Sequence, residues 1–276
     1  TGAAIGGALR AIEGSEITIK HSTFQNCMVT TSDGSSRAEG GALALRGCTL
    51  HMQDTTISEC RAHGSRAEGG AIHSRGDAVI VLQRSIITHC SAVAALPQGW
   101  GKGGGVFVDD GSVLLQLRTQ LISNVATTQG SAIMAQGGTI AYGLPAPRGY
   151  WVAAQQCLVY RSACPRDMMG NLIDPWCGST AQACSLTAHA NATIDETRCQ
   201  PISWNQPCDW QQNSALLGSY IQVLPLAPMD GDFPFRCAAG LLGGESAENQ
   251  RTSLCAGRCP AGRVCASEGS MEAAAC

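Results

Sequence analysis

The chain is predicted to be all-β, with a stack of parallel β coils in its first half and a cysteine-rich, mostly irregular second half. Three observations predict this organisation. A Gly-Gly-Ala motif followed by an aliphatic residue recurs at Gly6, Gly40 and Gly69, with degenerate copies at Gly103 and Gly130. Strand-like segments follow these copies. Eleven of the 15 cysteines lie from Cys157 onward.

The repeat length predicts one supersecondary unit per copy, stacked on its neighbours. The copies lie 34, 29, 34 and 27 residues apart, which predicts about five coils. Another glycine follows each motif 7 or 8 residues later, at Gly14, Gly47, Gly76, Gly111 and Gly137. These glycines are expected at the corners of the coils, where the backbone needs positive φ or close approach.

Two strand-like segments follow the glycines in the first four units. The first segments cover 16–20, 49–53, 79–83 and 114–118, and the second cover 22–27, 55–60, 85–90 and 120–125. They are rich in β-branched residues and lack the 3.6-residue apolar stripe of a helix. A helical solenoid is therefore disfavoured, and a β-sandwich stays as the main competitor.

Aligning the units produces columns of similar residues, as expected when coils lie parallel roughly 4.8 Å apart. The columns are Ile17, Leu50, Ile80 and Leu115; Ile19, Met52, Leu82 and Leu117; Phe24, Ile57, Ile87 and Ile122; and Cys27, Cys60, Cys90 and Val125. The three cysteines are expected to be buried free thiols, because cysteine is a good small hydrophobic residue.

These motifs resemble the right-handed parallel β-helix, or pectin-lyase-like, superfamily, and in particular its adhesin-like and polymorphic surface proteins. The resemblance covers residues 1–143 and implies a right-handed parallel β-helix. The asparagine of the second motif is kept at Asn26 and Asn124, but Glu59 and His89 replace it in the middle units. A continuous asparagine ladder is therefore not expected.

The repeat stops after Gly143, and residues 144–236 are predicted to be a cysteine-rich connector. The disulfide candidates there are Cys157, Cys164, Cys177, Cys184, Cys199 and Cys208. Six cysteines allow fifteen pairings, so the connectivity stays open. This cysteine density is typical of an oxidising compartment. A sequon at Asn191 is compatible with glycosylation there.

Residues 237–276 carry C-x-x-G-x-x-G and C-P-x-G-x-x-C elements and resemble the ephrin-receptor-like cysteine-rich repeat. Such modules are extracellular spacers held by disulfides, with Cys237, Cys255, Cys259 and Cys265 as the candidates. A zinc site is disfavoured because no histidine lies near these cysteines and no paired C-x-x-C motif exists. No metal or cofactor is expected.

The two resemblances together indicate a fragment of a large mosaic surface protein of a single-celled eukaryote. The expected function is that of a non-enzymatic extracellular structural or adhesive module. A net charge of −3 without a basic cluster argues against nucleic acid. No apolar run is long enough for a membrane span. The partner is unknown, with a glycan or another surface protein as candidates, and a receptor ectodomain is a further alternative.

The loops between units are the expected binding face, with Arg37, Arg66 and Trp100 as candidate ligand-binding residues. Two loops share an identical Ser-Arg-Ala-Glu-Gly-Gly-Ala stretch. The competing interpretation is a solvated ladder of Arg37, Glu39, Arg66 and Glu68. The histidines are scattered between columns, so each, His73 included, is expected to be a surface or polar-ladder residue.

A degenerate polysaccharide lyase or hydrolase is the enzymatic alternative. Glycoside hydrolysis needs two carboxylates across the scissile bond, and Asp109 and Asp110 are the only close acidic pair in the coils. Adjacent strand residues point to opposite faces, so the two would share a site only where the strand bends. The chain is therefore not expected to be an enzyme.

Overall fold

The structure is a computed structural model of the chain. It describes residues 3–31, 36–109, 111–144, 146–152, 156–160, 199–201, 219–223, 228–239, 241–243, 250, 255–261, 263–265, 270 and 274–275. The described residues are almost entirely strands and turns, and two compact units divide the chain. One unit holds residues 1–140 and 226–235, and the other holds 141–225 and 236–276.

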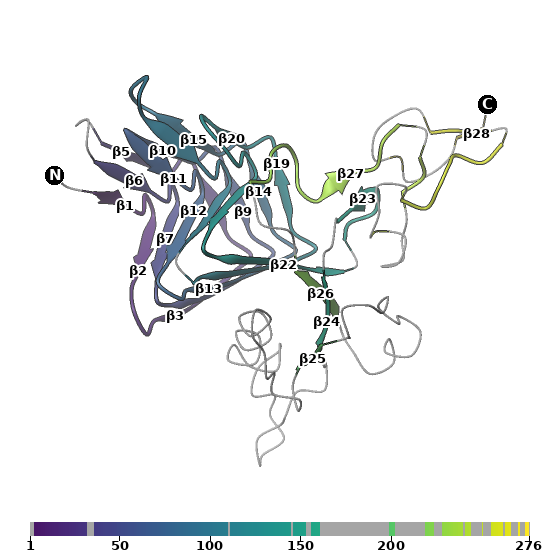
Figure 1. The fold of residues 1–276 in the computed structure, drawn as a ribbon, viewed down its shortest axis with the longest axis horizontal. Coiled ribbons are helices and arrows are strands. Elements are labelled where there is room, and N and C mark those ends of the chain that lie inside the picture. Colours follow the sequence, from purple (N-terminus) through teal and green to yellow (C-terminus); the bar gives the residue numbers. More distant parts are fainter. Residues whose placement is uncertain are drawn as a thin grey trace, which may run out of the picture. The chain divides into compact units, whose positions relative to one another are not determined.

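The first unit is a parallel β-solenoid, and its strands form five sheets that each run along the stack (Figure 1). Sheet A contains β1 (Ala4–Ile5), β6 (Arg37–Glu39), β11 (Arg66–Glu68) and β16 (Trp100–Lys102). Sheet B contains β2 (Leu9–Ala11), β7 (Leu43–Arg46), β12 (Ile72–Arg75), β17 (Val106–Asp109) and β21 (Ile133–Gln136). Sheet C contains β3 (Glu16–Lys20), β8 (Thr49–Gln53), β13 (Val79–Gln83) and β18 (Val113–Leu117).

The coil continues from sheet C into two sheets of short strands. Sheet D contains β4 (Thr23–Gln25), β9 (Thr56–Ser58), β14 (Ile86–Thr88) and β19 (Gln120–Ile122). Sheet E contains β5 (Met28–Thr30), β10 (Arg61–Gly64), β15 (Ser91–Ala94) and β20 (Val125–Ala126). The solenoid makes about four turns, fewer than the five that the glycine motifs predict, because the fifth copy contributes only β21 and the start of β22 (Thr139–Leu144).

The fourth coil lies one residue away from the predicted columns. Leu114 and Gln116 lie beside Ile80 and Leu82, so Leu115 and Leu117 were assigned to the wrong columns. Likewise, Leu121 takes the place that was predicted for Ile122. The one-residue shift originates at the preceding glycine. Gly111 lies against Asp77, which is one residue beyond Gly76. The spacing of the glycines therefore predicts the strand after Gly111 one residue too late.

The cysteine column also ends differently from the prediction. Val125 pairs with Ser91 and is 57% exposed, and buried Asn124 takes its place after Cys90. The Asn124 Oδ1 accepts a hydrogen bond from the Cys90 amide at 2.9 Å, and its Nδ2 donates to the Ile87 carbonyl at 3.0 Å. The asparagine therefore satisfies an amide and a carbonyl of the coil below, whereas the Cys60 and Cys90 thiols reach only the equivalent carbonyls, at 3.8 Å.

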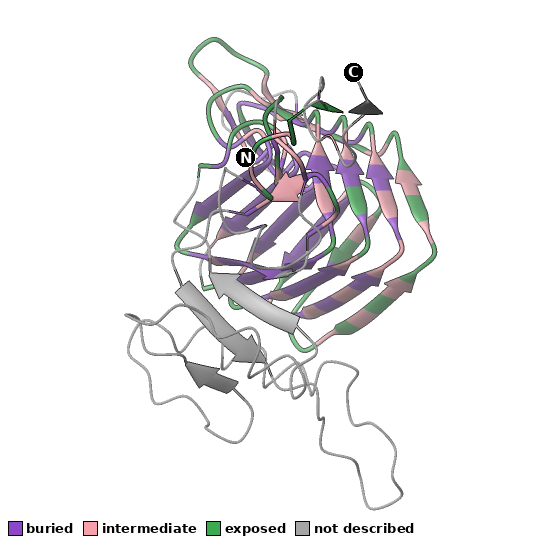
Figure 2. Cartoon of the chain, turned by 90° about the vertical axis from the view of Figure 1, so that its right-hand side faces the viewer, coloured by how far each residue is buried: buried purple, intermediate pink, exposed green. Residues whose placement is uncertain are grey.

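Large apolar side chains occupy the space enclosed by sheets B, C and D. The largest fully buried ones include Leu43, Leu45, Leu50, Met52, Ile57, Ile72, Ile80, Leu82 and Ile87. Burial increases along the stack: every second residue of β3 is exposed, whereas all of β18 is buried (Figure 2). The ladders of like residues thus form one continuous core.

Sheets A and E pack on each other through small side chains. Their shared core consists of Val29, Ala38, Ala62, Ala67 and Ala92. The motif glycines make this close approach possible. An added Cβ on Gly70 would lie 2.5 Å from the Ser91 amide nitrogen, and Gly69 has φ of 69°. The glycines predicted at the corners, Gly14, Gly47, Gly76, Gly111 and Gly137, all have positive φ as well, so that prediction is confirmed.

A returning segment, residues 228–235, covers the last coil within the same unit. Met229 and Phe233 bridge antiparallel to Ile133 and Leu121. The Asp230 and Asp232 carboxylates accept hydrogen bonds from backbone amides of the last coil, at 2.8 Å each. This segment satisfies polar groups that the end of a parallel stack would otherwise expose, and the repeat pattern does not reveal it.

Among its described residues, the second unit contains short strands and two disulfides. Two strands, β22 and β27 (Phe235–Arg236), begin in the first unit and end in the second. The other strands of the second unit are β23 (Tyr150–Trp151), β24 (Gln156–Tyr160), β25 (Cys199–Pro201), β26 (Ser219–Val223), β28 (Arg263–Val264) and β29 (Ala274–Ala275). Strand β26 pairs antiparallel with β22 and β24. Disulfides join Cys237 to Cys255 and Cys259 to Cys265. In the described part of the chain, no helix has the length and apolar character of a membrane span.

Candidate functional site

The three residues predicted as a ligand-binding face lie in one column of sheet A. Arg66 pairs in register with Arg37 on one side and with Trp100 on the other. They belong to strands β6, β11 and β16, not to loops as expected. Arg66 is exposed, whereas Arg37 and Trp100 are half-buried. Because parallel strands lie about 4.8 Å apart, their side chains form a regular row on the outer face of sheet A. We call this row the Arg-Arg-Trp ladder.

A third cation, Lys102, lies beside the aromatic end of the ladder. The Lys102 Nζ lies 4.8 Å from the centroid of the Trp100 ring, within cation–π range. The same ammonium donates a hydrogen bond to Gln136 Oε1 at 3.4 Å. Trp100 and Lys102 are two residues apart on β16, so both point away from sheet E. The ladder therefore ends in an aromatic side chain with a cation on it.

The glutamates of the same strands are buried, which contradicts the predicted solvated charge ladder. Glu39 and Glu68 are in register on β6 and β11 and are only 2% and 4% exposed. The chain turns sharply at the following glycine pairs, so the outer face of sheet B lies against these carboxylates. Arginine and glutamate of one short stretch thus have opposite environments.

His73, on the outer face of β12, contacts both glutamates. Its Nε2 lies 3.3 Å from Glu68 Oε2, and its Nδ1 lies 4.0 Å from Glu39 Oε2. The His73 side chain is 2% exposed, and its ring stacks on Phe107 with a centroid distance of 5.5 Å. The expectation that His73 is a surface or polar-ladder residue is wrong: it is the centre of a buried cluster with Glu39 and Glu68, the Glu-His-Glu cluster.

Arg75 orients one carboxylate of the Glu-His-Glu cluster. Its Nη1 donates a hydrogen bond to Glu39 Oε1 at 3.2 Å, which leaves Oε2 directed at His73. A small cavity, about 10 Å³ in volume, adjoins Glu39 and His73 and reaches the exposed side chains of Arg10 and Arg46. Space for about one water-sized species therefore lies between the cluster and the surface.

The sequence contains a signal for this cluster that composition alone does not reveal. Glutamate occurs at the same place in both copies of the Ser-Arg-Ala-Glu-Gly-Gly-Ala stretch, directly before the glycine pair. His73 follows the second pair by three residues. A strand residue before a sharp corner and one after it can meet on the inside of that corner. Columns of equivalent residues do not reveal this contact, because His73 and the two glutamates lie on strands of different sheets.

The predicted acidic pair cannot be assembled from the described residues. Asp109 ends β17, is half-buried and lies beside Gln136 of β21. Asp110 lies outside the described residues. The catalytic hypothesis for the pair is therefore untested.

The column of Cys27, Cys60 and Cys90 consists of free thiols, as expected, but only Cys60 and Cys90 are buried and Cys27 is half-buried. Each sulfur donates to the carbonyl two residues before it, and the Cys60 Sγ lies 3.2 Å from the Ser58 oxygen. Burial raises the pKa of Cys27 to about 11, and the neighbouring Cys60 adds to that rise. A hydrogen bond with Cys90, together with burial, raises the pKa of Cys60 further. Cys27 and Cys60 are therefore protonated and unreactive at neutral pH. The same hydrogen bond with Cys60 lowers the pKa of Cys90, which is fully buried.

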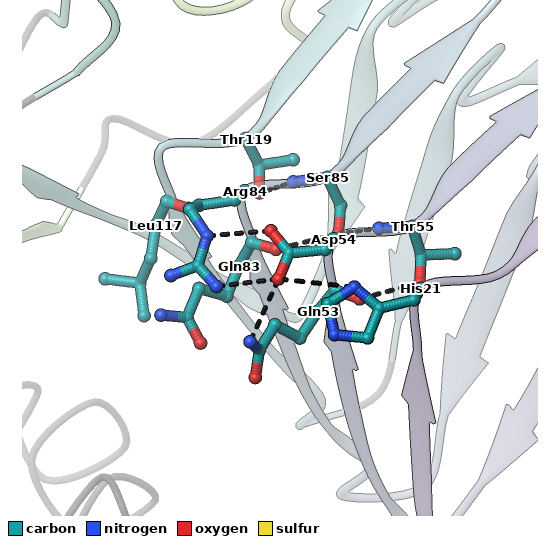
Figure 3. A network of polar contacts seen from close by, with 9 residues as sticks. All are labelled: His21, Gln53, Asp54, Thr55, Gln83, Arg84, Ser85, Leu117 and Thr119. Atoms are coloured by element: carbon teal, nitrogen blue, oxygen red, sulfur yellow. Dashed lines mark hydrogen bonds and ion pairs between the residues drawn. The ribbon is translucent and has the colours of Figure 1, made fainter.

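Asp54 is the centre of a surface network at the corner between sheets C and D (Figure 3). Arg84 donates to both Asp54 oxygens, at 2.7 Å each, and Gln53 Nε2 donates at 3.0 Å. These hydrogen bonds, that of Arg84 first, lower the pKa of Asp54 to about 2. Ser85 donates nothing to the carboxylate: it accepts from the Thr55 amide at 3.3 Å beneath it. The network aligns the corner residues of neighbouring coils, and no binding geometry accompanies it.

The remaining predicted site residues divide between paired and undescribed positions. Cys237, Cys255, Cys259 and Cys265 form the two disulfides, so the predicted stapling of the C-terminal region is confirmed there. The side chains of Cys157, Cys164, Cys177, Cys184, Cys199, Cys208 and Asn191 lie outside the described residues. The pairing of those cysteines and the glycosylation stay predictions.

Comparison of the chain with protein-family models, with curated proteins and with solved structures finds no significant match. The evidence for the parallel β-solenoid and for the disulfides is therefore the structure itself. The disulfides indicate an oxidising environment for the C-terminal region.

Proposed function

We propose that the chain is a non-enzymatic, extracellular structural and adhesive module that binds acidic glycans along the Arg-Arg-Trp ladder. The observation that carries the proposal is the register of Arg37, Arg66 and Trp100 on three successive strands. A rigid stack presents these side chains at fixed spacing without an ordering cost on binding. A polysaccharide with a regular repeat can place successive groups against the regularly spaced side chains of this row.

The chemistry of the row favours a polysaccharide with carboxylate or sulfate groups. Guanidinium groups bind such oxyanions in bidentate fashion, and an indole ring offers a flat apolar surface to a sugar ring. Lys102 adds a third cation beside Trp100. The acidic residues of the same strands, Glu39 and Glu68, are buried away from this row and do not oppose an anion.

The proposed setting is the cell surface, in a larger mosaic protein of the pectin-lyase-like, adhesin type. The disulfides of the C-terminal region support an oxidising location. Under this proposal the solenoid displays the ligand-binding row, and the cysteine-rich unit is a spacer that resists unfolding outside the cell. A receptor ectodomain would use the same two parts in the same way.

A glycan array tests the proposal with three variants. Wild-type protein is expected to bind sulfated or uronic-acid glycans, and Trp100→Ala and Arg66→Ala to lose at least about tenfold in affinity, as for removal of anchor residues. Arg61→Ala is the matched control, because Arg61 is also an exposed arginine but lies on sheet E. An equal loss of glycan affinity in Arg61→Ala, or unchanged affinity in Trp100→Ala, would contradict binding along the ladder.

The enzymatic alternative is tested on the same samples. Incubation with the bound acidic polysaccharide is expected to produce neither new reducing ends nor unsaturated uronates. If either appears and Asp109→Asn abolishes it, the module is a carbohydrate-active enzyme and the non-enzymatic proposal fails.

A further inference from the structure

We propose that Glu39, Glu68 and His73 form a binding site for one divalent transition-metal ion, with Zn²⁺ as the best fit. The inference is independent of the glycan ladder, and it departs from the sequence expectation of no metal. One ligand atom from each residue lies within 4.8 Å of the other two. Imidazole nitrogen and carboxylate oxygen are both common zinc ligands.

The donor positions are close to those of a tetrahedral site. Ligand bonds of about 2.0–2.2 Å place the donors of a tetrahedral ion roughly 3.4 Å apart. His73 Nε2 and Glu68 Oε2 are already 3.3 Å apart. Glu39 lies on the other side of the ring, with its Oε2 4.0 Å from His73 Nδ1, and one donor atom of each of the three residues lies within 4.8 Å of the others. A side-chain adjustment of up to about 1.4 Å therefore completes the set.

Two of these atoms have no hydrogen-bond partner among the described residues, although both are buried. They are Glu68 Oε2 and His73 Nε2, in side chains that are 5% and 2% exposed. A buried polar atom without a partner costs roughly 1–3 kcal/mol, more when it is charged. The two atoms face each other at 3.3 Å without hydrogen-bond geometry. An ion bound by both would satisfy each of them.

The surroundings hold the donors as metal sites require. Phe107 stacks on His73 and restricts its ring, and Arg75 donates to Glu39 Oε1 so that Oε2 points inward. Such hydrogen bonds behind the ligands orient them for the metal. Glu39 and Glu68 are fixed by backbone register. The small cavity beside Glu39 and His73 is also lined by the exposed residues Arg10 and Arg46, so the donors lie close to the surface.

Charge also favours a cation. Two buried carboxylates face a single guanidinium, that of Arg75, which is 29% exposed at its side chain. The two carboxylates and this guanidinium carry one net negative charge, which a divalent ion reverses. A metal-free ion-paired cluster is the outcome that competes with the proposal.

Titration of the full chain with Zn²⁺ after removal of metals by a chelator tests the site. We expect one ion per chain by calorimetry. His73→Gln and Glu68→Gln are expected to weaken binding at least about 100-fold, and Arg75→Gln about 10-fold, in line with the loss of a ligand and of an outer partner. Glu68→Gln keeps the side-chain size, so it carries the test if His73→Gln fails to fold. His51→Gln is the matched control on the outer face of β8.

Cobalt distinguishes this site from cysteine-bound metal. Co²⁺ in a nitrogen and oxygen site is expected to show weak visible bands without the intense near-ultraviolet absorption of cobalt–thiolate bonds. Visible bands that vanish in Glu68→Gln and persist in His51→Gln would support the site. Absence of a bound ion, thiolate absorption alone, or equal affinity in wild type and both ligand variants would each overturn it.

Discussion

In the solenoid, Cys27, Cys60 and Cys90 are free thiols one above another, whereas in the C-terminal region Cys237 and Cys255 are bonded 18 residues apart in the chain. The solenoid has a continuous apolar core, so its cysteines serve as small core residues. The C-terminal region has short strands and few buried apolar side chains among its described residues. Covalent links replace a core there. Cysteine content alone therefore does not reveal how a region is stabilised.

The largest expected effect that separates the two regions comes from removing a disulfide. The double variant Cys237→Ser/Cys255→Ser loses a link across 18 residues. It is expected to destabilise the C-terminal region by about 3 kcal/mol, as for loops of similar length. Limited proteolysis with mass spectrometry should show cleavage within residues 237–276 while residues 1–140 stay protected. Equal loss of protection in the solenoid would contradict the independence of the two regions.

The second prediction concerns the solenoid, whose apolar core should be stabilised by a single substitution. Gln116 is fully buried between apolar rungs beside Leu82, and among the described residues its amide has no hydrogen-bond partner. Gln116→Met keeps the length of the side chain and removes the unsatisfied amide. We expect stabilisation of the solenoid by roughly 1–3 kcal/mol in chemical denaturation. A destabilised variant would mean that the amide has a partner of its own.

Thiol reactivity tests the assignment of the cysteine column. With its pKa raised from 9.0 to about 11, half-buried Cys27 has a roughly 100-fold smaller thiolate fraction near pH 8 than an ordinary cysteine. Iodoacetamide should therefore leave Cys27 unmodified in the native protein and modify it in denaturant, as followed by peptide mass spectrometry. Rapid native modification would show that the column is open to solvent.

The smallest expected effect concerns the exposed network at Asp54. Its pKa is depressed from 3.8 to about 2, mainly by the Arg84 hydrogen bonds, so the folded state favours the ionised form. The stabilising contribution is present above about pH 4 and is lost as the pH falls through about 2. Asp54→Asn should melt slightly below wild type at pH 7, and the difference should disappear toward pH 2. A constant difference would point to a cause other than ionisation.

The sequence predicted the fold well where the repeats are regular. The strands 16–20, 49–53 and 79–83 appear at the predicted residues, because glycine corners and alternating apolar residues encode them locally. The fourth coil is displaced by one residue because Gly111 lies one position later in its corner than Gly76 does. One residue reverses which side chains face the core, so a small alignment error has a large structural effect.

The candidate sites were predictable only in part. Arg37, Arg66 and Trp100 were expected on one face, and the structure brings them into one column. Their neighbours Glu39 and Glu68 were expected in solvent and are buried. Within one short strand, alternation separates arginine and glutamate from the alanine between them, but it does not say which outer residues another sheet will cover.

By itself, the sequence determined the repeat, the glycine corners, the apolar ladders and the cysteine-rich second half, since each follows from local conformation or from residue type. Only the tertiary structure decided the number of full turns, the covering segment at 228–235 and the encounter of His73 with Glu39 and Glu68. These depend on how closely two sheets approach across a glycine corner and on where the chain returns. Such distances are set by packing between residues far apart in sequence, and no local pattern records them.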